Sequence, residues 1–175
     1  MQEPIYHTRK VTIVGAGAVG STFAYALMQA GIAEDIAIVD QNQDQAEGQV
    51  LDLAHGLQFT HPVSIHTGTP EDYADSQVIV IIGYKGATYF AVGLALVRIV
   101  RSILRNEHSV LTVSIRLQGE YDIDDVTLSV PCLVSGNGVE RIIATDLADN
   151  ELEALKNSAS VLRKTLDDLD GALTE

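Results

Sequence analysis

Three glycines near the N-terminus have the spacing of a phosphate-binding turn. Gly15, Gly17 and Gly20 follow a β-branched run at 10–14 and precede an alanine-rich, helix-forming stretch at 21–30. In a strand–turn–helix unit, glycines at these positions permit a tight turn, the close approach of a pyrophosphate, and close packing of helix on strand. The helix start adds free N–H groups and a positive dipole end. The pattern therefore predicts a dinucleotide site, against the alternative of a glycine-rich turn that binds nothing.

A carboxylate follows at the distance that ribose recognition requires. The apolar run at 36–39 predicts a second strand, and Asp40 follows it, 20 residues after Gly20. A carboxylate here would repel a 2′-phosphate, and neighbouring Gln41 and Asn42 supply no cation, so we expect NAD rather than NADP. The predicted cofactor-binding residues are Gly15, Gly17, Ala18, Val19, Gly20 and Asp40.

The composition excludes several classes of partner. The chain has 175 residues, a formal net charge of −13 and 46% hydrophobic residues. Such an acidic chain lacks the basic surface that nucleic acids and anionic membranes require. The single cysteine, Cys132, lies in an apolar run and is expected to be a buried thiol. No apolar run reaches the 18 residues that a membrane-spanning helix needs, so we expect a cytoplasmic protein. The sequence suggests no metal site.

The order of elements predicts an α/β fold. A helical stretch at 43–54 and a short strand at 63–66 follow Asp40, and a run of β-branched residues at 78–82 predicts a strand buried on both faces. This is the first half of a Rossmann-type parallel sheet.

The pattern changes in the second half of the chain. A long helix is expected at 87–105, and the last helix is expected at 150–169, with Asp149 as its N-cap. Between them, three β-rich runs separated by turns predict an antiparallel meander, at 110–117, 126–134 and 139–144. The predicted fold is therefore a partial Rossmann-type sheet followed by a helix, a three-strand meander and a C-terminal helix.

Specific motifs resemble those of bacterial L-lactate dehydrogenases, within the lactate/malate dehydrogenase family. The stretches at 11–21 and 46–56 resemble the N-terminal part of that family, and those at 85–89, 110–114 and 119–121 resemble its C-terminal region. The resemblance implies a partial NAD-binding domain at 1–83 and part of the substrate domain at 84–175. It also implies NAD-dependent oxidation of a small 2-hydroxy acid, L-lactate, with malate as the nearest alternative.

The two matching halves join at about 82–84, and the family's catalytic segments are missing between them. Absent are the mobile loop with its arginine, the Asn-Pro segment, the aspartate and arginine that orient the histidine and hold the substrate, and the histidine itself. None of the five histidines lies in the family's catalytic context: His7, His55, His61, His66 and His108. Thr88 is the one substrate-side residue that the resemblance retains. We therefore expect weak or absent turnover by this chain alone.

Three functional interpretations follow from the missing segments. The chain is a deletion form of a lactate dehydrogenase, a non-catalytic NAD-binding or oligomer-interaction module, or a dehydrogenase completed by another chain. Because the family has further strands beyond the one at 78–82, that strand should become an apolar edge. We expect self-association through this edge, or partial cover of the sheet by the helix that follows it.

Overall fold

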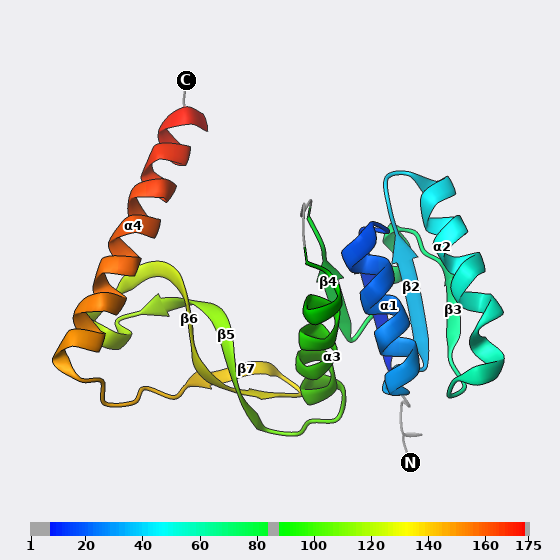
Figure 1. Cartoon of the computed structure of the whole chain (residues 1–175), viewed down its shortest axis with the longest axis horizontal. Coiled ribbons are helices and arrows are strands. Elements are labelled where there is room, and N and C mark those ends of the chain that lie inside the picture. The colour runs from blue at the N-terminus through cyan, green and yellow to red at the C-terminus, as the bar shows by residue number, and fades with distance from the viewer. Residues whose placement is uncertain (1–7, 84–87, 174–175) are drawn as a thin grey trace, which may run out of the picture. The chain divides into compact units, whose positions relative to one another are not determined.

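The computed structural model describes residues 8–83 and 88–173. The chain divides into two compact units, Met1–Glu107 and His108–Glu175 (Figure 1). Helices and strands of the first unit are β1 (Lys10–Val14), α1 (Ala18–Ala30), β2 (Asp35–Val39), α2 (Gln43–His55), β3 (Ser64–Thr67), β4 (Val78–Ile81) and α3 (Phe90–Leu104), with short 3-10 turns at Leu57–Phe59 and Pro70–Tyr73.

The first unit is built on a parallel sheet with the strand order β3-β2-β1-β4. β1 pairs with β2 from Lys10 opposite Asp35 to Val14 opposite Val39, and with β4 on its other side. β-branched residues dominate these strands because their stiff side chains pack well on a pleated surface. The predicted partial Rossmann-type sheet is therefore confirmed.

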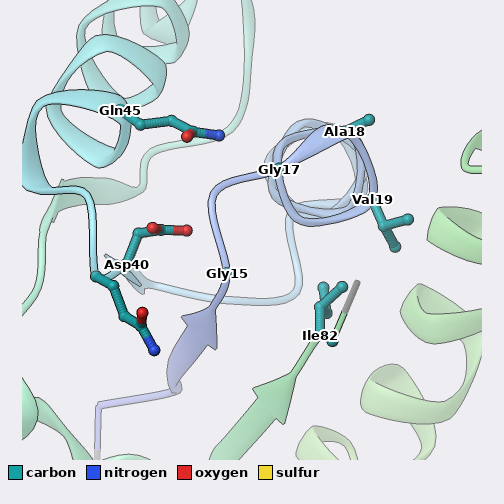
Figure 2. Close-up of a pocket in the computed structure, with 9 residues that line it drawn as sticks. Gly15, Gly17, Ala18, Val19, Asp40, Gln45 and Ile82 are labelled. Carbon is teal, nitrogen blue, oxygen red and sulfur yellow. The ribbon is translucent and has the colours of Figure 1, made fainter. Parts of the chain in front are cut away.

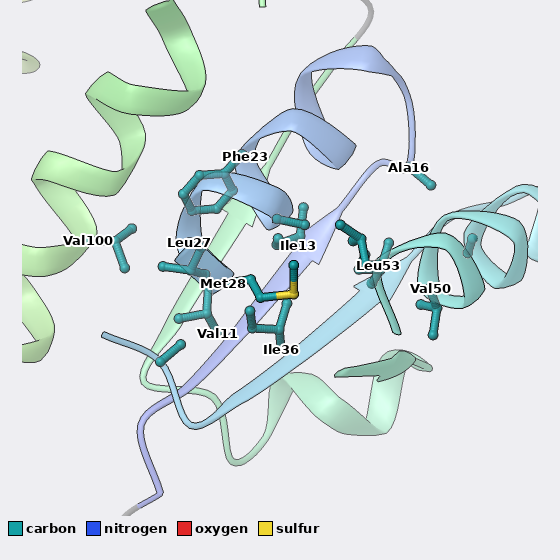
Figure 3. Close-up of a cluster of buried hydrophobic side chains, with 14 of the residues drawn as sticks. Val11, Ile13, Ala16, Phe23, Leu27, Met28, Ile36, Val50, Leu53 and Val100 are labelled. Atoms are coloured by element: carbon teal, nitrogen blue, oxygen red, sulfur yellow. The ribbon is translucent and has the colours of Figure 1, made fainter. Parts of the chain in front are cut away.

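Helices α1, α2 and α3 supply the apolar side chains that cover one face of this sheet (Figure 3). Gly93 of α3 lies against Thr22 of α1, and Val100 of α3 is only 2% exposed. Contacts thus place α3 with the first unit, although the resemblance assigns residues 84–107 to a C-terminal domain. The domain boundary at 83/84 remains a prediction about which domain of the family each residue corresponds to. The packing of α3 extends the first compact unit to Glu107.

β4 forms an edge of the sheet, as the sequence predicts. Its side chains alternate, with Val78 and Val80 packed against the core and Ile79 and Ile81 pointing to the other face. Ile79 is 42% exposed and Ile81 is 77% exposed. The expectation that this run is buried on both faces is therefore wrong for the outer face, because no described element covers these two isoleucines.

A polar cluster covers the N-terminal end of this outer face. Lys10 lies 2.7 Å from carboxylate oxygens of both Asp72 and Asp75, and its side chain is largely buried. Thr12 is fully buried, and its hydroxyl lies 2.6 Å from that of Ser76. The loop after β3 is therefore fixed to β1 by charge-assisted hydrogen bonds rather than by apolar packing.

The second unit is an antiparallel meander with one helix. Strands β5 (Ser109–Gln118), β6 (Asp124–Ser135) and β7 (Gly138–Ile142) pair in sequence order, and α4 (Asp149–Leu173) contacts β6. The predicted meander is confirmed, and Cys132 of β6 is a fully buried thiol, as expected.

The start of α4 differs from the sequence prediction. Asp149 is the first helical residue rather than the N-cap. Ala148 precedes it, and its N–H donates to the Glu151 carboxylate at 3.0 Å while its carbonyl accepts from the Glu151 N–H. The carboxylate of Glu151, the third residue of the helix, therefore accepts the N–H of the residue that precedes the helix. Within the described residues, no helix combines the length and apolarity needed to cross a membrane.

Candidate functional site

The turn between β1 and α1 needs glycine for three different reasons. Gly15 has φ of +115°, and a Cβ there would lie 2.7 Å from the Ile82 carbonyl oxygen. At Gly20, a Cβ would lie 1.8 Å from the Gly15 carbonyl oxygen, so any side chain would force α1 away from the turn. A Cβ at Gly17 would meet nothing within 4 Å. Gly15 and Gly20 thus shape the turn, and Gly17 keeps the surface of the turn open to a ligand.

Above this turn lies a pocket with a volume of about 530 Å³ (Figure 2). Five of the six predicted cofactor residues line it, and Gly20 is instead buried against the Gly15 carbonyl of the turn. The described residues that line it are Gly15, Gly17, Ala18, Val19, Asp40, Gln41, Gln45, Ile82 and Gly83. The list of cofactor-binding residues predicted from the sequence did not include Gln41, Gln45, Ile82 and Gly83. Three of these follow the carboxyl ends of β2 and β4, which is the signal that could have found them.

Asp40 is held in place by the turn that it faces. One carboxylate oxygen accepts the Ala16 N–H at 2.6 Å, and the other accepts the Asn42 N–H at 2.9 Å. The Ala16 N–H, and then the Asn42 N–H, hold the pKa of this carboxyl below its usual range. Asp40 is therefore ionised at neutral pH, and each carboxylate oxygen retains a further lone pair to accept from a hydroxyl.

Gln45 reaches the same turn from the first part of α2. Its side-chain nitrogen donates to the Ala16 carbonyl oxygen at 3.0 Å. Asn42 caps the helix by accepting the Gln45 N–H, which sets where α2 begins. Asp40 and Gln45 therefore contact the two backbone polar groups of one residue, Ala16, from the same side of the turn.

These residues fit the adenosine and pyrophosphate part of NAD. The first N–H groups of α1 have no partner within the helix, and the open surface of Gly17 lets an anion reach them. Asp40 can accept the ribose hydroxyls. Among the described residues, the lining includes one carboxylate and no cation, and it therefore favours a ribose with free hydroxyls over one with a 2′-phosphate.

The substrate-side residue and the described histidines lie outside this lining. Thr88 is exposed, has φ of +60° and precedes α3 instead of starting it. The rest of the family-like stretch before it, 84–87, lies outside the described residues. The four described histidines do not line the pocket: His55, His61, His66 and His108. His66 instead lies between Asp35 and Asp72, at 3.3 and 3.2 Å.

Comparison with known proteins places both parts of the chain in one family. The NAD-binding domain of lactate/malate dehydrogenase matches residues 9–88, and the α/β C-terminal domain of the same family matches residues 75–171.

Similar proteins include an L-lactate dehydrogenase of Treponema denticola, 31% identical over 310 aligned positions that span 93% of this chain and 98% of that protein. An L-lactate dehydrogenase of Thermoanaerobacterium saccharolyticum is 51% identical over 90 residues, covering 51% of this chain and 29% of that protein. The fold also matches the crystal structure of a lactate dehydrogenase from a Medee basin deep-sea metagenome library, with a TM-score of 0.90 at 21% identity, covering 94% of this chain and 99% of that one. The chain therefore belongs to the lactate/malate dehydrogenase family.

Proposed function

We propose that this chain is an internally shortened L-lactate dehydrogenase that binds NAD through its adenosine half and does not turn over lactate by itself. The preformed pocket carries the proposal, because its turn, its open Gly17 surface and its ionised Asp40 all suit that half of the cofactor. Lactate is preferred over malate because the curated relatives that we compared are L-lactate dehydrogenases.

The lengths of the aligned proteins support an internal deletion. The alignment with the Treponema denticola protein runs over 310 positions, whereas this chain has only 175 residues. The alignment covers 98% of that protein, so residues similar to both of its ends are present in this chain. This difference in length supports the proposal that the missing positions lie inside the chain, near the point at 82–84 where the two family-like halves meet.

The expected loss of turnover follows from general magnitudes. Losing a positioned general acid or base costs roughly 10²–10⁴ in rate. Losing an arginine that pairs with the substrate carboxylate also removes charge-assisted orientation. These effects do not add simply when the groups act together, but the residual rate should lie close to the uncatalysed one.

A titration of the purified chain with NADH tests the binding part of this proposal. We expect saturable binding in the micromolar range by NADH fluorescence, and loss of that binding in Gly17→Val. A Cβ at Gly17 meets nothing within 4 Å, so the variant should fold while its side chain fills the phosphate position. Gly48→Val is the matched control, because its Cβ also meets nothing within 4 Å and Gly48 is not among the lining residues.

Two results would contradict the proposal. Absence of NADH binding by the folded wild-type chain would show that the pocket does not hold the cofactor. Formation of NADH from NAD and L-lactate, abolished by Gly17→Val, would show that the chain is catalytically active. Parallel assays with malate test the alternative substrate of the family.

We also propose that copies of this chain associate through β4. Its outward side chains are the exposed Ile79 and Ile81, and its outer backbone groups lie at the end of the described sheet. An exposed apolar sheet edge can pair with a further strand, although β4 itself is only four residues long.

A further inference from the structure

We propose that Gln45 is a positioning residue that holds the phosphate-binding turn in its binding conformation before the cofactor arrives. This inference rests on the proposed function, because it concerns how the NAD pocket is prepared. It starts from one hydrogen bond, in which the Gln45 side-chain nitrogen donates to the Ala16 carbonyl oxygen at 3.0 Å. Figure 2 shows the Gln45 side chain extending from α2 toward the turn that carries Gly15 and Gly17.

The bond fixes the peptide group that supplies the Gly17 N–H. The Ala16 carbonyl and the Gly17 N–H belong to one planar trans peptide, so fixing the oxygen fixes the direction of the N–H. The neighbouring peptide is fixed separately, because its Ala16 N–H donates to Asp40 at 2.6 Å. Two consecutive peptide planes are thus oriented by two side chains, Asp40 from the end of β2 and Gln45 from α2.

A glycine-rich turn needs such support more than an ordinary loop does. Gly15 and Gly17 have access to many backbone conformations in the absence of contacts, so an unsupported turn would lose that freedom only when the ligand binds. Holding the turn beforehand transfers this cost from binding to folding, which raises affinity without adding a contact to the ligand. Gln45 therefore strengthens cofactor binding through the backbone of Ala16 and Gly17.

The role requires a hydrogen-bond donor at position 45, and this separates it from packing. Gln45→Met keeps the length and neutrality of the side chain but cannot donate. Gln45→Lys keeps a hydrogen-bond donor. Its affinity for NADH is measured in about 0.5 M salt, because salt screens the direct attraction between the lysine charge and the phosphates. Gln43→Met is the matched control, because Gln43 is exposed on the same helix and is not among the lining residues.

The experiment combines NADH titration with ¹⁵N relaxation of the free protein. We expect Gln45→Met to weaken NADH binding about threefold to tenfold, the loss of one neutral hydrogen bond. The ¹⁵N order parameter of the Gly17 N–H should fall in the free variant, because its peptide plane is released. Gln45→Lys should restore both values, and Gln43→Met should match the wild type.

Different failures have different meanings. Wild-type affinity in Gln45→Met overturns the inference, and so does weaker binding with an unchanged Gly17 order parameter or without rescue by lysine. If the folded wild-type chain does not bind NADH at all, the proposed function fails. The order parameters of Gly17 then still decide whether Gln45 holds the turn.

Discussion

Replacing Val100 with alanine tests whether α3 is part of the first unit. Val100 is 2% exposed and belongs to the core cluster formed with β1, β2 and α1. Its replacement removes two methyl groups, worth about 1.6 kcal/mol in transfer free energy. The cavity adds roughly 1 kcal/mol, and the higher helix propensity of alanine returns about 0.5 kcal/mol. The first unit should therefore lose about 2 kcal/mol of unfolding free energy.

Urea unfolding followed by circular dichroism, together with native-state hydrogen exchange, measures this loss. Exchange in α1 should accelerate, because α1 packs against α3, whereas exchange in β6 of the second unit should not change. Leu94→Ala is the matched control on the same helix, since Leu94 is 66% exposed and its truncation should cost less than about 0.5 kcal/mol.

The refuting result is specific. A loss below about 0.5 kcal/mol for Val100→Ala would show that α3 does not pack on the first unit. Faster exchange confined to β5–β7 would instead place α3 with the second unit, in agreement with a compact boundary at 83/84.

Two further predictions concern the outer face and the edge of the sheet. Hydrogen bonding from Lys10, and then from the Thr69 N–H, holds the pKa of Asp72 far below its usual range, so Asp72 contributes stability above about pH 4 that is lost as pH falls further. Asp72→Asn should lower the free energy of unfolding by about 2 kcal/mol at pH 7. It should also reduce the loss of stability between pH 7 and pH 3, which urea unfolding at both pH values measures. An unaltered acid dependence would contradict the stabilising role of the Asp72 carboxylate. Asp52→Asn, at an exposed position of α2, is its control. For the edge formed by β4, light scattering on size-fractionated wild-type protein should give masses above the 18.8 kDa of the monomer. Ile81→Lys should shift the mass toward the monomer. A monodisperse wild-type monomer would argue against association through β4.

Much of the fold follows from local sequence patterns. The parallel strands, the meander and both long helices were predictable because hydrophobic periodicity and turn residues act over short distances. Helix starts were less predictable. The predicted helix at 87–105 begins only at Phe90, after Thr88 at φ +60°, and Ala148 rather than Asp149 precedes α4.

The residues of the candidate site were likewise predictable only in part. The spacing of Gly15, Gly17 and Gly20 and the position of Asp40 were sufficient to predict a dinucleotide pocket, because one strand–turn–helix–strand unit builds most of it. Ile82 and Gly83 enter the lining only because β4 pairs with β1, a contact between residues far apart in sequence. No local pattern reports such a pairing.

By itself, the sequence determined the glycine turn, the carboxylate after β2 and the junction of two family-like halves. Each is a matter of residue type and spacing along the chain. Only the tertiary structure decided that α3 covers the first sheet beside α1, that β4 packs against the core with one face only, and that Gln45 contacts Ala16. These outcomes depend on which surfaces meet after folding, because the free energy of burying an apolar stripe or pairing an amide depends on the partner that the fold supplies.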